Sequence, residues 1–238
     1  SEALRDSCNY YFYEVGYRLA TNNYSTAYND SLGIEKLQKY ASLFGLNERT
    51  GIEIEEAAPQ IANEFPVMAA IGQSNNNYTT VQLARYVTAV ANEGTVYQYT
   101  LLNRLEDSDG NVLQTFEPQV RNQIDVLDTE EWNAIHSGMR MVVENTKEFD
   151  GFPIEAAGKT GTAQQNLKRP NHALFVGYAP YDDPEISIAT RIAYGYTSHN
   201  AAKLARNVFA YYFNVENEDE LLNGQAANGN SSSNEISD

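Results

Sequence analysis

The sequence predicts an α+β fold in which an antiparallel sheet is flanked by helices. Four helices are predicted in the first 145 residues, three from apolar residues that recur with the period of an α-helix and one from its capping residues. Three strand-like segments follow between residues 154 and 194, and the turn sequence Asp182-Asp183-Pro184 makes the last two an antiparallel hairpin. One more helix follows them. Helices and antiparallel strands are thus grouped separately along the chain, as α+β folds require.

The first two helices are predicted from single apolar stripes. In the first helix, four residues fall on one face at i, i+4, i+7 and i+11, namely Cys8, Phe12, Val15 and Leu19. Ser7 stands at the N-cap position directly before this stripe. The second helix is expected from about Ser31 to Phe44, and Gly45 provides a natural C-terminal stop. Residues 46–78 are expected to be irregular.

The starts of the next two helices are predicted from their capping residues. Thr79 and Gln82 have the spacing of a capping box at the start of the third helix, and Gly94 ends it. The fourth helix is expected to begin at Asp128, with Glu131 at the matching position, and to run to about residue 145.

Strands are predicted after the third and fourth helices. Two strands are expected at 95–106 and 111–116, with Asp109-Gly110 as a hairpin signal between them. The main sheet is expected from three further segments, 154–164, 172–179 and 185–194.

The end of the chain divides into a helix and a polar tail. The last helix is expected at 200–213, with Leu204, Val208 and Tyr211 on one face. Residues 214–238 contain six acidic residues and no basic ones, and from 217 on Asn, Gly, Ser and Glu dominate. Such a composition predicts disorder.

Composition excludes several classes of protein. The 238 residues include 16 basic and 32 acidic residues, for a formal net charge of -16, so the chain lacks the basic surface that a nucleic-acid partner requires. The single cysteine, Cys8, cannot form an internal disulfide. The three histidines lie far apart and show no metal-ligand spacing. No apolar run reaches the roughly 18 residues of a membrane helix, so any anchor is expected outside this sequence.

Lys159-Thr160-Gly161-Thr162 is the first candidate for chemistry. The ammonium group supplies positive charge, the two hydroxyls supply hydrogen-bond donors, and Gly161 lets a ligand backbone approach the strand closely. This pattern could bind a carboxylate. Taken alone it is weak, because a Lys-Thr-Gly triplet arises by chance in many proteins.

Ser7-Cys8-Asn9 is the second candidate. In a regular helix the side chains of Ser7 and Asn9 would point about 200° apart. If Ser7 precedes the helix, both side chains can face one cleft. The simpler alternative is an N-cap serine followed by a surface asparagine.

Together the two motifs resemble two of the three motifs of penicillin-recognising serine acyltransferases. Their flanking sequences, in this order, resemble the transpeptidase domain of class B penicillin-binding proteins, most closely the elongation type. The segments that carry the resemblance are 7–19, 40–52, 71–84, 157–164 and 172–182. The resemblance covers roughly residues 1–213, leaving 214–238 as an acidic tail.

The resemblance implies a fold and roles for individual residues. The implied fold is a penicillin-binding protein/β-lactamase-like sheet with a helical lobe, incomplete in this chain. Thr160 and Thr162 would bind the terminal carboxylate of the substrate, and the backbone N–H of Thr162 would be one oxyanion-hole donor. Lys159 would raise the local positive potential and help to shuttle protons. Ser7 would assist proton transfer to the leaving group, and Asn9 would hold a substrate amide and the lysine of the nucleophile motif.

The nucleophile motif of the family, Ser-x-x-Lys, does not occur in this sequence. In the family it precedes Ser-x-Asn, and only six residues precede Ser7 here. We therefore expect a C-terminal portion of the transpeptidase domain that is inactive alone and needs the upstream part of the same protein. Whether that part is a separate chain, cleaved off or simply not included stays open.

The implied function is peptidoglycan cross-linking through a serine acyl-enzyme, with stem peptides ending in D-Ala-D-Ala as donors, β-lactams as inhibitors and no cofactor. Cell-wall synthesis proteins are the implied partners, and the implied location is the outer face of a bacterial cell membrane. Two alternatives remain: a D,D-carboxypeptidase or β-lactamase relative with water as acceptor, and a non-catalytic penicillin sensor or scaffold.

Overall fold

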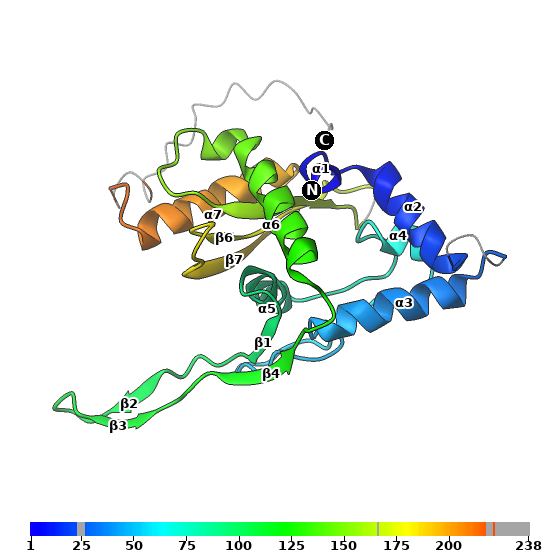
Figure 1. The fold of residues 1–238 in the computed structure, drawn as a ribbon. Helices are drawn as coiled ribbons and strands as arrows, with labels where there is room; N and C mark the ends of the chain where they lie inside the picture. The colour runs from blue at the N-terminus through cyan, green and yellow to red at the C-terminus, as the bar shows by residue number, and fades with distance from the viewer. Residues whose placement is uncertain (23–26, 166, 218–220, 222–238) are drawn as a thin grey trace. The chain divides into compact units, whose positions relative to one another are not determined.

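A computed structural model describes residues 1–22, 27–165, 167–217 and 221 (Figure 1). The chain divides into two compact units, one of Asp6–His136 and one that combines Ser1–Arg5 with Ser137–Asp238. Most of the predicted tail, residues 218–220 and 222–238, lies outside the described residues. Within the described ranges, no helix has the length and apolar character needed to cross a membrane.

The unit of residues 6–136 combines helices with two small antiparallel sheets. Its helices are α2 (Asn9–Ala20), α3 (Asp30–Leu43), α4 (Pro66–Ala69) and α5 (Thr80–Ala91), and α6 (Thr129–Glu144) begins in it. Its strands are β1 (Thr95–Gln98), β2 (Arg104–Glu106), β3 (Val112–Thr115) and β4 (Gln119–Gln123), paired as β1 with β4 and β2 with β3. The predicted strand at 95–106 is therefore wrong, because this segment forms two strands, and β4 was not predicted.

Local capping chemistry starts three of these helices. The capping box of α5 is confirmed, because the Thr79 hydroxyl accepts from the Gln82 N–H at 3.2 Å and the Gln82 side chain accepts from the Thr79 N–H at 2.8 Å. Asp128 and Glu131 make the same reciprocal pair at α6. At α3, the side chain of Asn29 accepts from the N–H of Leu32. Polar caps of this kind satisfy backbone N–H groups that have no partner inside the helix.

Ser7 is not a helix cap, contrary to the prediction. The N-cap position of α2 belongs to Cys8, whose side chain makes no capping bond, and the helix begins at Asn9. Ser7 lies before the helix with φ 47°, in the left-handed region that residues other than glycine rarely occupy. Ser7 therefore precedes the helix, as is needed if its side chain and that of Asn9 are to face one cleft. The prediction that Ser7 caps the helix is wrong.

The core of this unit joins α5, β1 and α6 around one aromatic side chain. Its buried members are Ala89, Val96, Ile124 and Trp132. Phe44 adds an edge-to-face contact with Trp132 at 6.3 Å between ring centroids. Trp132 is only 4% exposed, in agreement with the packing role that its helical position indicates.

Arg85 of α5 ties down the loop that follows α3. Its side chain is 2% exposed, and it donates to the backbone carbonyls of Gly45, Glu48 and Arg49. Gly45 has φ +73°, and an added Cβ there would lie 2.6 Å from an Arg85 nitrogen. Glycine at this position thus permits both the turn and the close approach of the guanidinium.

The second unit is built on one three-stranded antiparallel sheet. Its strands β5 (Ala157–Ala163), β6 (His172–Ala179) and β7 (Ile186–Ile192) lie in the order β5-β6-β7. Its helical elements are α1 (Glu2–Arg5), the end of α6, the 3-10 turn η1 (Lys147–Phe149) and α7 (Ser198–Tyr212). The predicted α+β class, the three strands and the β6–β7 hairpin are confirmed.

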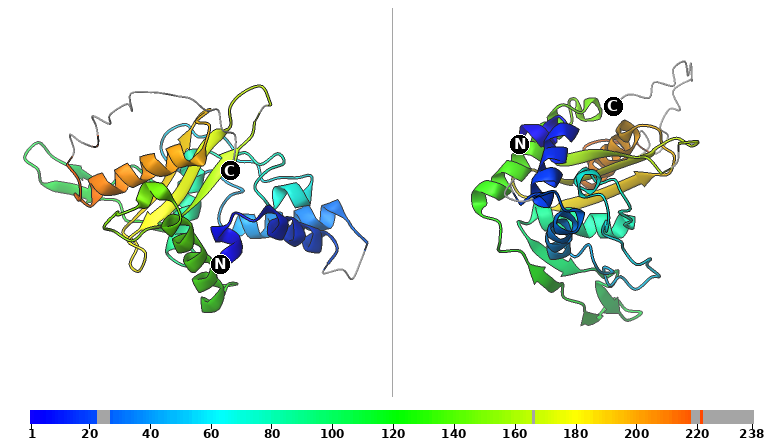
Figure 2. Two further views of the ribbon diagram at one scale, coloured as in Figure 1. Left: turned by 90° about the horizontal axis from the view of Figure 1, so that it is seen from above. Right: turned by 90° about the vertical axis from the view of Figure 1, so that its right-hand side faces the viewer.

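Helix α7 packs along one face of this sheet (Figure 2). The face of α7 that is buried carries mostly small side chains, namely Ser198, Ala201, Ala202, Ala205, Phe209 and Ala210. The predicted apolar stripe does not form the buried face of the helix, because Leu204, Val208 and Tyr211 are 45%, 38% and 61% exposed. Alanines let the helix backbone approach the sheet closely, and Phe209 fills the remaining space against Phe149 and Phe175.

Candidate active site

Strand β5 holds the Lys-Thr-Gly-Thr motif as an end strand of its sheet. It pairs with β6 over its whole length, from Ala157 opposite Tyr178 to Ala163 opposite His172. Gly158, which directly precedes the motif, is required by packing, since an added Cβ would lie 2.3 Å from the Phe175 ring. The sequence around the motif therefore fixes the strand firmly against its neighbour.

The register assigns the motif side chains to two faces of the sheet. Thr160 lies opposite Phe175, which packs in the core beneath α7, and Thr162 lies opposite Ala173. Lys159 and Gly161 belong to the other face, because successive side chains in a strand alternate. The motif residues are thus gathered at one sheet edge, with the lysine on the face that α7 does not cover.

The Lys159 ammonium reaches along the strand to its neighbour. Its Nζ donates to the Thr160 carbonyl oxygen at 3.0 Å and lies 3.5 Å from the Thr160 Oγ1. Both side chains are half-buried. An ammonium group next to a hydroxyl forms a compact donor set, which suits recognition of a carboxylate.

The other two predicted site residues lie at the start of α2. Ser7 precedes the helix and Asn9 is its first residue, and both are exposed. Both belong to the unit of residues 6–136, whereas the Lys-Thr-Gly-Thr motif belongs to the other unit. The structure therefore gathers the site residues as two local groups, one at the beginning of α2 and one on β5.

Sequence reasoning missed a polar cluster at the end of β5. His172 is 7% exposed, its Nδ1 accepts from the backbone N–H of Tyr194 at 3.1 Å, and its Nε2 lies 3.0 Å from Oε1 of Gln165. Because Nδ1 is an acceptor, Nε2 carries the proton and donates to Gln165. Burial, and secondarily the Arg191 guanidinium, lower the pKa of His172 and favour this neutral form.

His172 thus joins the loop after β5 to the loop after β7. Its ring also packs on the Tyr194 ring, with 4.9 Å between centroids. Tyr194 has φ 55°, so the chain turns sharply at this point. The only advance signal was a histidine at the start of a strand, which by itself indicates no particular partner.

Lys-Thr-Gly on an end strand and Ser-x-Asn at a helix start are two of the three motifs of penicillin-recognising acyltransferases. The family model for the penicillin binding protein transpeptidase domain matches residues 1–210. This chain therefore belongs to the penicillin-binding protein transpeptidase domain family, and the predicted resemblance is confirmed.

Individual relatives agree with this assignment. The chain is 31% identical to the peptidoglycan D,D-transpeptidase MrdA of Haemophilus influenzae over 250 residues, which cover 90% of this chain and 36% of that protein. It is 25% identical to penicillin-binding protein 2A of Bacillus subtilis over 95% of this chain and 36% of that protein. The chain thus spans about a third of the length of these relatives.

Solved structures share the fold. Penicillin-binding protein 2B from Streptococcus pneumoniae superposes with a TM-score of 0.76 at 24% identity, covering 90% of this chain and 39% of that one. Penicillin-binding protein A from M. tuberculosis, in its imipenem acyl-enzyme complex, gives a TM-score of 0.74 at 23% identity over 89% of this chain and 46% of that one. At these identities the likeness concerns the fold.

Proposed function

We propose that this chain forms part of a peptidoglycan D,D-transpeptidase that works through a serine acyl-enzyme and is acylated by β-lactams. The observation that carries the proposal is the Lys159 ammonium beside the Thr160 hydroxyl on an end strand. Membership of the transpeptidase domain family supports it. The nucleophilic serine belongs to a Ser-x-x-Lys segment outside this sequence.

In the proposed acylation, that serine attacks the carbonyl carbon between the two terminal D-alanines. Thr160 and Thr162 bind the terminal carboxylate, and Lys159 adds positive charge next to it. The backbone N–H of Thr162 stabilises the negative charge that develops on the carbonyl oxygen. The serine hydroxyl gives its proton to the lysine of its own motif as it attacks. When the C–N bond breaks, this proton passes through Ser7 to the nitrogen of the departing D-alanine.

In the second step, an amine of a neighbouring stem peptide attacks the ester and releases the serine. Asn9 holds an amide of the bound peptide and the lysine of the nucleophile motif. An acceptor amine gives a cross-link, whereas water would give the carboxypeptidase or β-lactamase alternative. Identification of the products separates these outcomes.

The surroundings of the enzyme are part of the proposal. We place it at the outer face of a bacterial cell membrane, anchored by a segment outside this sequence and working with other cell-wall synthesis proteins. The alternative is a penicillin sensor or scaffold. The presence of Ser7, Asn9 and Lys159 together argues against it, since a scaffold needs none of these side chains.

Labelling with a fluorescent penicillin tests the proposal. We expect no covalent adduct with the 238-residue chain alone, and one adduct per molecule once the natural upstream segment is restored, read by denaturing gel and intact mass. Absence of labelling in a folded, complete protein would favour the scaffold alternative. Labelling of the isolated chain would place the nucleophile on a serine of this sequence.

Replacing Ser7 with alanine in the complete protein is expected to slow acylation about 10²-fold without stopping it, because a proton-transfer group is lost. Stopped-flow acylation with a chromogenic cephalosporin measures the rate. Ser31→Ala is the matched control, since Ser31 is an exposed serine of α3 in the same unit. Equal rates for Ser7→Ala and the unmodified protein would remove Ser7 from the mechanism.

A further inference from the structure

Two arginines at one end of the β5-β6-β7 sheet have no carboxylate partner among the described residues. Arg169 lies in the loop after β5, and Arg191 is the penultimate residue of β7. Six other arginines do pair with carboxylates, namely Arg18, Arg85, Arg104, Arg121, Arg140 and Arg206. Other cations of the chain also bond groups that are not carboxylates, as Arg49 does with the carbonyl of Glu56. What distinguishes Arg169 and Arg191 is that both contact the same pair of rings, His172 and Tyr194.

The two guanidinium groups are instead held by an aromatic pair. Nη1 of Arg169 donates to the Tyr194 hydroxyl at 2.7 Å, and its guanidinium carbon lies 5.2 Å from the centre of that ring. Nη2 of Arg191 lies 3.4 Å from each ring nitrogen of His172. Because each guanidinium has five N–H donors, these contacts orient the group and leave donors available.

The neutral state of His172 is compatible with this arrangement. Its two ring nitrogens are occupied by Gln165 and by the Tyr194 backbone, so the ring cannot turn away without losing both bonds. An imidazolium ion at this position would repel Arg191. The ring therefore serves as an uncharged support for a guanidinium, and the low pKa of His172 agrees with that role.

The sheet register relates these arginines to the Lys-Thr-Gly motif. Arg191 lies opposite Leu174, which in turn lies opposite Gly161, so Arg191 is on the same face of the sheet as Lys159. His172 closes the same face at the end of β5, opposite Ala163. Adjacent strands are about 4.8 Å apart, so the β5 and β7 backbones are about 10 Å apart in this row.

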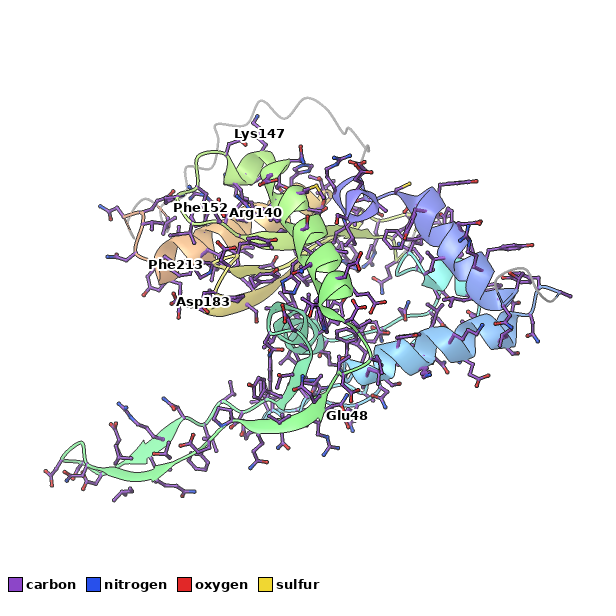
Figure 3. The ribbon with its side chains drawn as sticks, in the orientation of Figure 1. Glu48, Arg140, Lys147, Phe152, Asp183 and Phe213 are labelled. Atoms are coloured by element: carbon purple, nitrogen blue, oxygen red, sulfur yellow. The ribbon has the colours of Figure 1, made fainter. Side chains whose placement is uncertain are left out.

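Charge is separated between the two ends of the sheet. The end at the β6–β7 turn carries the acidic residues Asp182, Asp183 and Glu185, of which Asp183 is labelled in Figure 3. The end that follows Thr162 carries Arg169 and Arg191. An anionic group bound along β5 would therefore be attracted towards the end beyond the motif.

We propose that Arg169 and Arg191 form a subsite for a second carboxylate, carried by the part of the acyl-donor substrate that continues past Thr162. This inference rests on the proposed transpeptidase function and adds a substrate class to it: donors with an acidic substituent besides the terminal carboxylate. Guanidinium groups bind carboxylates through paired, charge-assisted hydrogen bonds. Because both arginines are exposed, the attraction weakens as salt concentration rises.

Benzylpenicillin and carbenicillin form a matched pair of probes, because carbenicillin differs by one added carboxylate on the acyl side chain. The second-order acylation rate constants of both are measured on the complete protein, and their ratio is compared between variants. The variants are Arg169→Gln, Arg191→Gln, the double variant and Arg191→Lys. Both rates come from one preparation, so the ratio cancels any loss of folded protein.

The carbenicillin-to-benzylpenicillin ratio is expected to fall about tenfold in the double variant, the typical effect of losing hydrogen bonds to a charged group. The ratio for Arg191→Lys should lie between those of the unmodified protein and Arg191→Gln, because lysine keeps the positive charge but lacks the planar set of donors of a guanidinium. Lys203→Gln, which removes one exposed positive charge on α7, should leave the ratio unchanged.

An unchanged ratio in the double variant would overturn the subsite while leaving the transpeptidase assignment in place. An equal fall in Lys203→Gln would overturn it as well, since it would indicate a general effect of net charge. Failure of both penicillins to acylate the complete, unmodified protein would refute the proposed function itself. The two failures are therefore distinguishable.

Discussion

Replacing Lys159 with alanine in the complete protein is expected to lower the rate of acylation by penicillin about 10³-fold, the scale of losing a preorganised electrostatic contact in an active site. The ammonium is the positive charge that β5 presents next to the Thr160 hydroxyl. Alanine keeps the strand but leaves neither charge nor donors. The effect should appear mainly in the acylation step, because in the proposed mechanism Lys159 supplies the positive charge next to the substrate carboxylate.

Lys203→Ala is the matched control for this variant, since it also replaces a lysine of the same unit with alanine. Its acylation rate should equal that of the unmodified protein. Thermal unfolding should be similar for all three proteins, because the register of β5 with β6 depends on backbone pairing and on Gly158. Normal penicillin labelling of a folded Lys159→Ala protein would refute the assignment of this lysine.

Replacing Arg85 with alanine is expected to lower the free energy of unfolding by about 3–5 kcal/mol, as is typical when one partner of a buried charged network is removed. The guanidinium is almost fully buried and bonds three carbonyls of the loop after α3. Without it, these carbonyls lose their donors and a cavity remains. Burial lowers the pKa of Arg85, because it takes the charged guanidinium out of water.

Arg121→Ala is the control for Arg85→Ala, because Arg121 also pairs with Glu48 but is 57% exposed. Arg121→Ala should lower the free energy of unfolding by less than about 1 kcal/mol, because exposed ion pairs usually contribute no more than this. Equilibrium unfolding in urea measures both variants. Equal destabilisation by the two substitutions would show that the carbonyl contacts of Arg85 add nothing beyond its charge.

The parts of the fold that depend on neighbouring residues could be predicted from the sequence. The boxes at Thr79 and Asp128 are local chemistry, since donor and acceptor lie three residues apart, and both formed as expected. The hairpin of β2 and β3 around Asp109-Gly110 is local as well. Strand β4 was missed because its sequence, QVRNQ, is mostly polar and exposed, and its partner β1 is distant in sequence.

The buried face of α7 shows why apolar spacing can fail. Leu204 and Val208 are the more hydrophobic side chains, yet alanines and Phe209 contact the sheet. Hydrophobicity measures the free energy of burial, whereas the sheet selects for side chains that fit the available distance. The distance between the helix and the sheet cannot be read from a single sequence.

The candidate site divides in the same way. Lys159 and its neighbours were found because the motif is a contiguous run. The cluster around His172 brings together Gln165 and Arg169 from the loop after β5, Arg191 from β7 and Tyr194 from the loop after β7, and only the folded sheet places them side by side. Tyr194, which completes this cluster, has a positive φ, and nothing about a tyrosine in the sequence predicts that conformation.

The position of β5 at the end of its sheet has a consequence for self-association. Its side away from β6 has no strand partner in the described chain, and unpaired strand edges can recruit any extended peptide. Charged side chains on such edges are known to discourage this pairing. Lys159 is therefore suited to a second task, that of a gatekeeper that keeps the edge open for substrate by resisting other strands. A chain that lacks it should aggregate more readily at high concentration.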